Sequence, residues 1–399
     1  MTALAVIGAG QAACTLIAEL LRGDFQGTIQ VFNAEGIDPY QRPPLSKTSF
    51  DQTISETAHP LLPPQCKADP RVTWVASEVT AIDPDQGRVT ANGTDFFADH
   101  LVLATGTRAT RPTIAGVPEN ALHTLRKHAD RLQLEQALAH ASTPVIIGAG
   151  FMAFELAAVI ASDTRHVQIL ARGPRALPQV SAESAAYLVA RSQAKLHTNC
   201  HAVRYDPHTQ TLTTNQGELE TDCLIATVGS RPNSELLEPF GLADADGVAV
   251  DAWMQTPHPR VSAIGEVCRH LHPSVGQSLR VESISEANDT ATTLAKRLLG
   301  QPVPFQAVPW FWSDQGREKL QIAGLAARDD ATLLNLDAPD RQVVIRHRAG
   351  QVTAVEAINT ATEFMAARRL FEQGPIALNE VHAAGSMMAL LQSSRSSRS

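Results

Sequence analysis

The sequence lacks paired cysteines, long apolar runs and an excess of positive charge, and each absence excludes a class of protein. The five cysteines include no C-x-x-C and no closely spaced pair, which argues against a disulfide framework, a zinc site and a dithiol redox centre. A polar residue soon interrupts every apolar stretch, so no segment suits a bilayer span. The net charge of −8 disfavours nucleic-acid binding. We therefore expect a cytoplasmic protein with no membrane span, no nucleic-acid partner and no metal site.

The chain is long and apolar enough to build more than one core. Its 399 residues predict two or three domains. Hydrophobic residues make up 44% and charged residues 19% of the sequence, a balance unlike that of disordered chains. We therefore expect a globular protein with several domains.

A glycine-rich pattern, G-x-G-x-x-A, occurs twice. The first copy lies between an apolar run at residues 4–7 and a helical pattern at residues 15–21. The second lies between an apolar run at residues 144–147 and a helical pattern at residues 155–161. In such a loop the first glycine permits a tight turn, the second lets the backbone approach a pyrophosphate, and the small third residue lets helix and strand pack closely. The following helix N-terminus favours an anion. The motif glycines are Gly8, Gly10, Gly148 and Gly150.

The repeat extends beyond the glycine loops. One loop alone is weak evidence, because a glycine-rich turn is often only a packing solution. Each copy, however, is closed by a buried-strand pattern that ends in a glycine turn, at residues 101–106 and at residues 224–229. A third such ending, at residues 261–266, precedes a helical region at residues 283–299. We infer two dinucleotide-binding modules, one inserted within the other.

The remainder of the chain has a different pattern. Residues 342–345 and 352–355 read as strands, and a helical pattern follows at residues 362–373. This indicates a small α+β C-terminal domain. The serine- and arginine-rich end, residues 393–399, is polar and of low complexity, so we expect a flexible tail.

Three motifs are more specific than the glycine loops. Residues 40–47 read Y-Q-R-P-P-L-S-K, residues 310–315 read W-F-W-S-D-Q and residues 280–283 read R-V-E-S. They resemble the signatures of the flavoprotein reductases that serve Rieske-type oxygenases and ferredoxin-dependent P450s: the ferredoxin, rubredoxin and putidaredoxin reductases. Leu125-Arg126, the segment 229–233 and Gly324 follow in the same order, and the resemblance covers residues 1–391.

The resemblance implies a fold and a domain order. The fold is an α/β fold of the glutathione-reductase type, with two Rossmann-like dinucleotide-binding domains and the small α+β C-terminal domain. The expected boundaries are 1–112 and 232–305 for the two parts of the FAD-binding domain, 113–231 for the NAD(P)-binding domain, 306–392 for the C-terminal reductase domain and 393–399 for the tail.

The resemblance also implies an activity. Such a protein is an FAD-dependent NAD(P)H:ferredoxin oxidoreductase, which passes electrons from NADH or NADPH through FAD to an iron–sulfur ferredoxin. The ferredoxin, Rieske-type or plant/adrenodoxin-type, feeds a terminal oxygenase such as those of aromatic hydrocarbon catabolism. Because no Cys/His cluster is found in this chain, the iron–sulfur centre belongs to a separate protein. The sequence leaves the oligomeric state open.

Several site residues can be weighed directly. Lys47 follows two prolines that fix the backbone, and a held cation beside a flavin stabilises negative charge on the reduced ring; the alternative is an exposed loop lysine. Arg42 either binds pyrophosphate or makes a weak surface ion pair. Trp310 and Trp312 share one strand face and form an aromatic wall beside a planar cofactor, or belong to a core. By resemblance Glu155 lies where nicotinamide approaches flavin; otherwise it is an acid that favours the helix dipole.

The predicted site is therefore as follows. The catalytic residues are Lys47, Glu155 and Trp312. The resemblance implies Ala12, Val79, Arg126, Glu266 and Ile284 as FAD contacts. The full set of expected cofactor-binding residues is Gly8, Gly10, Ala12, Glu35, Arg42, Lys47, Val79, Ala104, Thr105, Gly106, Arg126, Gly148, Gly150, Glu155, Arg172, Gly229, Gly265, Glu266, Glu282, Ile284 and Trp312.

The FAD module departs from the family pattern at two places. The acid expected at the end of its second strand, to bind a ribose, is replaced by Ala34, and Glu35 follows at once and takes over in our interpretation. The Gly-Asp expected near the flavin is Gly265-Glu266, and the added methylene displaces the carboxylate. We expect altered FAD affinity.

The NAD(P) module departs at its second strand. Relatives that use NADH carry Glu at the position of Ala171, where a carboxylate would bind the adenosine ribose and repel a 2′-phosphate. Arg172 and Arg175 follow and can offer charge-assisted bonds to phosphate. We predict that both coenzymes work.

Other functions stay open at this stage. The alternatives are a rubredoxin reductase, another NAD(P)H-dependent flavoprotein oxidoreductase, and a flavoprotein that uses its redox state as a switch. A purely structural protein with vestigial loops conflicts with the intact lysine and tryptophan motifs. An acidic ferredoxin would need a basic patch on this acidic chain. The candidates are Arg341, Arg346, Arg348, Arg368 and Arg369, unless these are solvated and paired with acids such as Asp337 and Asp340.

Overall fold

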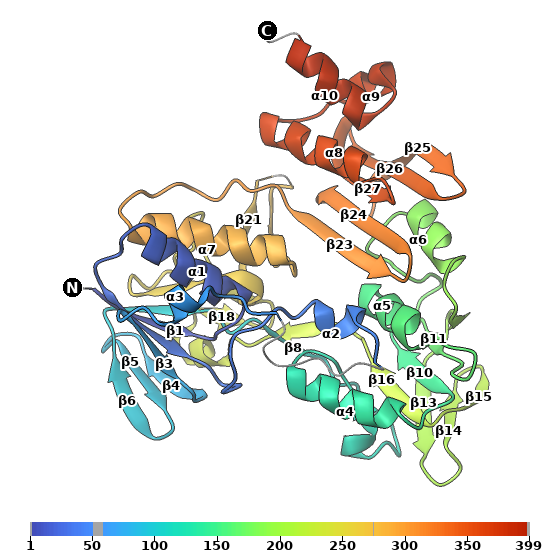
Figure 1. Ribbon diagram of the computed structural model, residues 1–399, viewed down its shortest axis with the longest axis horizontal. Coiled ribbons are helices and arrows are strands. Elements are labelled where there is room, and N and C mark those ends of the chain that lie inside the picture. Colours follow the sequence, from blue (N-terminus) through green and yellow to red (C-terminus); the bar gives the residue numbers. More distant parts are fainter. Residues whose placement is uncertain (1, 51–58, 274, 397–399) are drawn as a thin grey trace. The chain divides into compact units, whose positions relative to one another are not determined.

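The computed structural model describes residues 2–50, 59–273 and 275–396 (Figure 1). The chain divides into two compact units, each assembled from three segments. The first unit comprises Met1–Gln41, Ser55–Arg108 and Arg231–Ala307. The second comprises Arg42–Ile54, Ala109–Ser230 and Val308–Ser399. The chain passes between the units within β8 (Thr107–Ala109) and β17 (Ser230–Pro232).

The first unit is built on a five-stranded parallel sheet with the order β20-β7-β1-β2-β3. The central strand β1 places Leu4 opposite Ile29 of β2 and opposite His100 of β7. Helices α1 and α7 pack against each other (Figure 1). The bounds are β1 (Ala3–Ile7), α1 (Gln11–Arg22), β2 (Thr28–Phe32), β3 (Val72–Val75), β7 (His100–Leu103), β20 (Val261–Ala263) and α7 (Ile284–Leu298).

Apolar sequence runs and small residues account for this packing. The run Leu4 to Ile7 is buried, as a strand covered on both faces must be. Ala12 and Ala13, at the start of α1, are also buried, because their small side chains let the helix lie close to the sheet. These residues belong to the main apolar core of the unit.

Smaller elements complete the first unit. An antiparallel sheet contains β4 (Val79–Asp83), β5 (Arg88–Ala91) and β6 (Thr94–Phe97). A four-stranded sheet contains β18 (Ala243–Asp244), β19 (Gly247–Ala249), β21 (Cys268–His272) and β22 (Gln277–Leu279). The short helical turns are α3 (Pro64–Lys67), η2 (Glu235–Phe240) and η3 (Gly265–Val267).

The second unit repeats the plan of the first. Its parallel sheet has the order β12-β11-β10-β16-β9, so that β10 lies between β11 and β16 as β1 lies between β2 and β7. An antiparallel sheet of three strands again follows. The bounds are η1 (Glu119–Ala121), β9 (Leu122–His123), α4 (His128–Leu138), β10 (Pro144–Ile147), α5 (Phe151–Ile160), β11 (Gln168–Leu170), α6 (Ala182–Val189), β12 (Lys195–His197), β13 (Ala202–Asp206), β14 (Thr211–Thr214), β15 (Gly217–Glu220) and β16 (Cys223–Ala226).

A mixed α+β element forms the rest of the second unit. Five antiparallel strands have the order β23-β24-β27-β26-β25, and Phe364 and Ala367 of α8 belong to one apolar core with Val343 and Val355 of the sheet. The bounds are β23 (Trp310–Gln315), β24 (Glu318–Gly324), β25 (Ala331–Ala338), β26 (Arg341–Arg348), β27 (Gln351–Ile358), α8 (Ala361–Gln373), α9 (Leu378–Ala384) and α10 (Met387–Ser396). The α+β composition expected from the sequence is confirmed.

The last helix extends into the segment for which the sequence predicts a flexible tail, residues 393–399. Helix α10 continues to Ser396. The hydroxyl groups of Ser393 and Ser396 donate to backbone carbonyls three and four residues earlier, which accommodates serine within a helix. Residues 397–399 lie outside the described part of the chain.

Candidate active site

The first glycine of each loop is required by close backbone packing. Gly8 has φ +110°, and a Cβ there would lie 2.3 Å from the carbonyl oxygen of Ala104. Gly148 has φ +111°, and its Cβ would lie 2.4 Å from the carbonyl oxygen of Thr227. Both glycines also donate from their N–H to the last residue of the neighbouring strand, Phe32 and Leu170 respectively. The two loops therefore have the same construction.

The second glycine of the first loop is not required by the protein itself. A Cβ on Gly10 would meet no heavy atom within 4 Å, so the space beside it is open to a group other than this chain. In the second loop, a Cβ on Gly150 would lie 3.2 Å from Nε2 of Gln179. Each glycine is an extended N-cap. Helices α1 and α5 start directly after them, earlier than the sequence indicated, because the caps precede the apolar pattern.

The turn after β2 fixes Glu35 through two hydrogen bonds. Its Oε2 accepts a hydrogen bond from the hydroxyl of Tyr40 at 2.7 Å, and its N–H donates to Oδ1 of Asn33 at 3.2 Å. Ala34 is exposed and carries no polar side chain. Glu35 is therefore the acid that the described chain offers at this strand end.

Several more of the predicted cofactor-binding residues follow β7 and β20. Gly265 has φ +73°, and a Cβ there would lie 2.9 Å from Cβ of Ala12, so glycine is needed where α1 approaches. Oε2 of Glu266 accepts from the hydroxyl of Thr107 at 3.0 Å. Thr105 donates from its hydroxyl to the carbonyl of Asn233 at 2.6 Å. The predicted residues in the first unit are Gly8, Gly10, Ala12, Glu35, Val79, Ala104, Thr105, Gly106, Gly265, Glu266, Glu282 and Ile284.

The R-x-E-S motif organises the start of α7. Arg280 pairs with Oε1 of Glu282 at 2.7 Å and donates to the carbonyl of Glu266 at 3.2 Å. Ser283 caps the helix, because its hydroxyl accepts from the N–H of Glu286 at 3.1 Å. Ile284 is the first residue of the helix.

In the second unit, Lys47 and Glu155 form a largely buried ion pair. Lys47 is the last residue of the one-turn helix α2 (Pro44–Lys47), and its Nζ lies 2.5 Å from Oε1 of Glu155 on α5. The two side chains are 17% and 6% exposed. Ser46 and Ser313 each donate a hydroxyl hydrogen bond of 2.7 Å to the same carboxylate. The structure thus brings together two predicted catalytic residues that are far apart in the sequence.

The tryptophan motif lies next to this pair. Ser313, which contacts Glu155, directly follows Trp312 on β23. The rings of Trp310 and Trp312 stack with centroids 5.5 Å apart and an angle of 27°, which confirms the expected shared strand face. Trp310 also packs against Phe364, so it belongs partly to the C-terminal core. Because successive residues of a strand point to opposite faces, the Trp312 ring lies on the face of β23 opposite the Ser313 hydroxyl that contacts Glu155.

Arg131 is a residue of this site that the sequence did not indicate. It is fully buried on α4 and donates to the carbonyl of Leu45 at 2.8 Å, of Thr48 at 3.0 Å and of Ser49 at 2.8 Å. Its guanidinium also pairs with Glu135 at 2.6 Å. Burial lowers the pKa of Arg131, and Glu135 opposes this. Arg131 therefore fixes the backbone on both sides of Lys47. Its i,i+4 acid was the only local signal, and that pattern usually marks an exposed helix face.

Arg42 and Arg126 are also brought together. Nη1 of Arg42 donates to the carbonyl of Arg126 at 2.7 Å, and the N–H of Arg126 donates to Oδ2 of Asp130 at 2.8 Å. Arg42 therefore holds a backbone carbonyl of the segment that carries Arg126.

The two candidate phosphate-binding arginines, Arg172 and Arg175, follow the end of β11 and differ in their surroundings. Ala171 is buried, and its N–H donates to the carbonyl of His197 at 2.8 Å. Arg175 donates from Nη1 to the carbonyls of Val180 and Ser181 and so holds its own loop. Arg172 is exposed. Arg172 is therefore the better placed of the two to meet a solvent-borne phosphate.

The basic patch that we expected on the C-terminal strands is wrong at Arg346. This side chain is buried and pairs with Glu356 at 3.2 Å, while its Nη2 donates to the carbonyl of Ala327 at 2.9 Å. Glu356 in turn accepts from the hydroxyl of Ser181, the N-cap of α6. Arg346 therefore links elements within the unit and is not a rim charge. The alternation of residues along β26 did not predict this burial, because the acid that pairs with Arg346, Glu356, lies on another strand, β27.

The cysteines of the described chain are unpaired and mostly buried. All five cysteines are free. Burial raises the pKa of the Cys14 and Cys268 thiols and raises that of Cys223 to about 12. Among residues 2–50, 59–273 and 275–396, no helix combines the length and the apolar character needed to cross a membrane.

Two repeated dinucleotide loops, each on a parallel sheet, together with a buried lysine–glutamate pair define a nucleotide-dependent oxidoreductase. Comparison with known families agrees. Residues 2–291 match the pyridine nucleotide-disulphide oxidoreductase family and residues 310–390 match the reductase C-terminal family. The chain belongs to the pyridine nucleotide-disulphide oxidoreductase family.

The relatives are reductases of electron-transfer systems. Rhodocoxin reductase of Rhodococcus erythropolis is 33% identical over 379 residues, covering 92% of this chain and 88% of that protein. Terpredoxin reductase of a Pseudomonas species is 31% identical, covering 92% of each. The solved ferredoxin reductase for the CYP199A2 system of Rhodopseudomonas palustris superposes with a TM-score of 0.90 at 28% identity, covering 95% of this chain and 97% of that one. The solved covalent putidaredoxin reductase–putidaredoxin complex gives 0.88 at 26%, covering 95% of each chain.

These matches confirm four of the predictions: the family resemblance, the glutathione-reductase type of fold, the enzyme class, and FAD with NADH or NADPH as cofactors. The individual cofactor-binding residues and the domain boundaries stay predictions.

Proposed function

We propose that this chain is an FAD-dependent NAD(P)H:ferredoxin oxidoreductase that supplies electrons to an oxygenase through an iron–sulfur protein. The observation that carries this proposal is the buried Lys47–Glu155 pair, braced by Ser46 and Ser313. A buried pair of this kind is weak evidence for stability alone, since desolvation offsets much of its attraction. The pair is better explained by function, because it fixes the Lys47 ammonium group as a cation that can stabilise negative charge developing in the reaction.

The residues present fit the two nucleotides. Gly10 leaves open space where a pyrophosphate would approach, and Glu35 supplies a carboxylate at the strand end for a ribose. Gly148 and Gly150 repeat the loop for the second nucleotide. Accordingly, residues 1–112 and 232–305 would form the FAD-binding domain, 113–231 the NAD(P)-binding domain and 306–392 the C-terminal domain.

The chain's own residues would act as follows. FAD, when bound, supplies the conversion of a hydride donor's electron pair into single electrons. Lys47 holds positive charge for the reduced flavin, and Glu155 keeps the Lys47 amine in one position. Trp312, stacked with Trp310, contributes an apolar aromatic surface that would exclude water from the reacting region.

The acceptor is a small iron–sulfur protein of the Rieske or the plant/adrenodoxin type. Support comes from the relatives, which include terpredoxin reductase and the ferredoxin--NAD(+) reductase component of a p-cumate 2,3-dioxygenase system from Pseudomonas putida. The free thiols of the chain fit the cytoplasm as the place of this reaction.

Coenzyme use is open to direct measurement. Because Ala171 offers no carboxylate and Arg172 is exposed, we expect NADH and NADPH both to work, with kcat/KM values within about a hundredfold. Arg172→Ala should lower kcat/KM for NADPH by about tenfold, the value of one charge-assisted contact, and leave that for NADH unchanged. Arg204→Ala, which removes another exposed arginine of the same unit, is the control. If kcat/KM for NADPH and kcat/KM for NADH are each the same in Arg172→Ala as in the parent protein, Arg172 does not belong to the coenzyme site.

The proposal is tested on the purified protein. It should be yellow, contain about one FAD per chain, and bleach when a reduced nicotinamide is added without oxygen. It should then reduce both ferricyanide and an iron–sulfur ferredoxin such as putidaredoxin. A protein that bleaches but turns over ferricyanide only slowly would instead be a redox switch, and one that cannot bind FAD would refute the proposal.

A further inference from the structure

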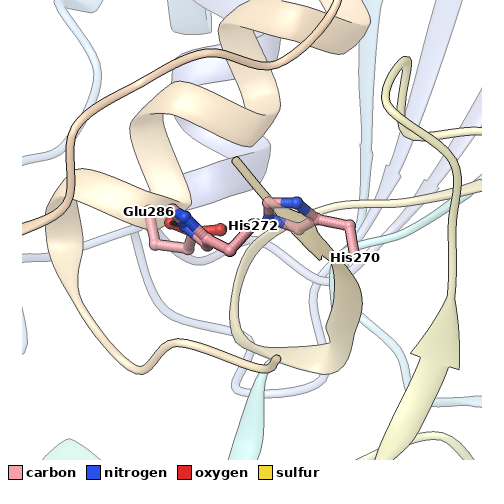
Figure 2. A group of neighbouring side chains, drawn as sticks. All are labelled: His270, His272 and Glu286. Atoms are coloured by element: carbon pink, nitrogen blue, oxygen red, sulfur yellow. Dashed lines mark hydrogen bonds and ion pairs between the residues drawn. The ribbon is translucent and has the colours of Figure 1, made fainter. Parts of the chain in front are cut away.

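Three buried side chains outside the proposed redox site converge in the first unit (Figure 2). His270 and His272 lie on β21, and Glu286 lies in the first turn of α7. Nε2 of His270 is 2.5 Å from Oε1 of Glu286, and Nε2 of His272 is 3.5 Å from Oε2. The three side chains are 1%, 0% and 3% exposed. We call this group the His–His–Glu cluster.

Local structure explains why the cluster forms. Along β21 the residues alternate between buried and exposed, so His270 and His272 point to the same inner face while Leu271 is exposed. Glu286 is held by its own helix, because its N–H donates to the capping hydroxyl of Ser283. The ring of Phe305 packs edge-on against both imidazoles, with centroids 4.3 and 5.4 Å away. The cluster is therefore preorganised and screened from water.

The contacts of His270 are compatible with a cation in the cluster. Its Nδ1 lies 3.3 Å from the carbonyl oxygen of Leu271, and a carbonyl can only accept, so this contact is a hydrogen bond in the tautomer that carries the hydrogen on Nδ1. Nε2 then directs a lone pair at a carboxylate oxygen, which is also an acceptor. Two acceptors at this separation repel unless a positive charge lies between them, and that charge is either a proton or a metal ion.

We propose that the His–His–Glu cluster binds one divalent transition-metal ion of the zinc class. Two imidazole nitrogens and one carboxylate oxygen are the protein donors of known His₂Glu zinc sites, with bonds of about 2.0–2.2 Å. The candidate ligand atoms all lie within 4.8 Å of one another, and binding would require the imidazole of His270 and the carboxylate of Glu286 to move apart so that the ion lies between them. The bond from Nδ1 of His270 to a backbone carbonyl is the outer contact that ligating histidines typically make.

The ion would tie the β21–β22 hairpin to the start of α7. That helix start carries Ile284, one of the predicted FAD contacts, but the ion itself takes no part in the proposed reaction. The sequence analysis found no metal site, because the histidines and the glutamate belong to separate elements. The H-x-H spacing on a strand was the only available signal.

The experiment measures metal retained by the full-length flavoprotein. The protein is produced in zinc-supplemented medium, freed of any affinity tag, dialysed against a weak chelator and analysed by mass spectrometry for metal and by absorbance for FAD. We expect about one zinc ion per chain. Glu286→Gln and His272→Gln should each lower this by at least tenfold, with the FAD content unchanged. His140→Gln, which removes an exposed histidine of the second unit, should retain the wild-type metal content.

Two results would overturn the proposal. A wild-type protein that is loaded with FAD but retains less than about a tenth of an ion per chain holds a proton in the cluster instead. Equal metal content in wild type and Glu286→Gln means that the ion lies elsewhere. If Glu286→Gln does not fold, His272→Gln and X-ray absorption at the zinc edge of the wild type decide, since two imidazole nitrogens must appear in the ligand shell. The FAD measurement separates failure here from failure of the proposed function.

Discussion

At the scale of single residues, Lys47 shows how a charged side chain can be fixed without exposure. Its amine lies 2.5 Å from Glu155, whose carboxylate also receives the hydroxyls of Ser46 and Ser313. We expect Lys47→Met to retain FAD but to slow its reduction by NAD(P)H by roughly a hundredfold, at the low end of a single electrostatic contact in a transition state. Anaerobic stopped-flow absorbance at the flavin band measures this rate.

Two further variants separate the effect of losing the Lys47 charge from secondary effects of the substitution. Lys67→Met removes a lysine that pairs with Asp38 at the surface and should reduce at the wild-type rate. Lys47→Met combined with Glu155→Gln removes the carboxylate charge left without its partner. If the double variant recovers the wild-type rate, the cation itself has no role and only the unpaired acid was harmful.

The sequence predicts the role of a residue only where the contacts that constrain that residue are local. Gly8 and Gly148 could be identified because a strand–turn–helix path forces them against a neighbouring strand, and that path leaves a motif. Arg131 and Arg346 could not, because burial of an arginine depends on carbonyls and acids contributed by distant segments. The His–His–Glu cluster was missed for the same reason.

At the scale of elements, α2 is a helix of one turn that cannot hold its shape alone. Arg131 of α4 supplies three hydrogen bonds to the carbonyls around it. We predict that Arg131→Met lowers the free energy of unfolding by about 3–5 kcal/mol, because buried acceptors and Glu135 lose their partner. It should also slow flavin reduction, since Lys47 loses its fixed position. Thermal and urea unfolding of the FAD-loaded protein, followed by stopped flow, measure both.

A surface arginine provides the comparison. Arg22 pairs with Glu19 one turn away on α1 and is mostly exposed, so Arg22→Met should cost no more than about 0.5 kcal/mol. Comparable losses in Arg131→Met and Arg22→Met would mean that the carbonyl contacts of Arg131 contribute little.

The central sheet of the first unit carries a pH-sensitive residue. His100 on β7 is buried, its Nε2 accepts from the hydroxyl of Ser262 at 2.8 Å, and Arg297 lies nearby. Burial, followed by the charge of Arg297, lowers the pKa of His100 to about 4. The folded state therefore prefers the neutral ring, so stability is full above the unfolded pKa of about 6.5 and is lost as the pH falls toward 4.

We expect this to remove roughly 3 kcal/mol of stability between pH 6.5 and 4. Urea unfolding at several pH values measures the slope. His100→Gln, whose amide oxygen can also accept from Ser262, should flatten it, while His140→Gln at the surface should not. An unchanged slope in His100→Gln would assign the acid sensitivity to other groups.

Element boundaries were less predictable than element identity. Apolar runs located β1 and β10 closely, but α1 and α5 begin at Gln11 and Phe151, before the apolar pattern starts. Their starts depend on the extended caps Gly10 and Gly150, a backbone property. The serine-rich end resembled a tail, yet serine hydroxyls bonded to the preceding turn let α10 continue.

At the scale of the whole molecule, net charge bears on recognition. A chain with a charge of −8 meets an acidic ferredoxin only through a local basic surface. Arg346 is buried, but Arg341 and Arg369 are exposed. We predict that Arg341→Glu/Arg369→Glu lowers the rate of putidaredoxin reduction by about tenfold at low salt, and less at high salt as screening grows.

Ferricyanide reduction by the same double variant should stay at the wild-type rate, because that small acceptor does not need a protein docking surface. Arg22→Glu, a charge reversal in the first unit, is the matched control. Loss of ferricyanide activity would indicate damage to the flavin site, and retention of both activities would exclude these two arginines from docking.

The repeat of two modules could be read from the sequence, whereas the division of the chain could not. Residues 42–50 follow the first glycine module in sequence but group with the second unit. Arg131 bonds to Leu45 from 86 positions away, and no local pattern records that contact. Motifs therefore predicted which chemistry the segment carries, and tertiary contacts decided which unit holds it.

The distribution of thiols has a practical consequence. Cys14, Cys200, Cys223 and Cys268 are buried, and Cys66 on α3 is the partly exposed one of the five. Alkylating reagents attack an accessible thiolate, so the folded protein should accept a maleimide at Cys66. The natural chain would then attach to a conducting surface by a single bond, in one orientation, and its electron output could be recorded as a current.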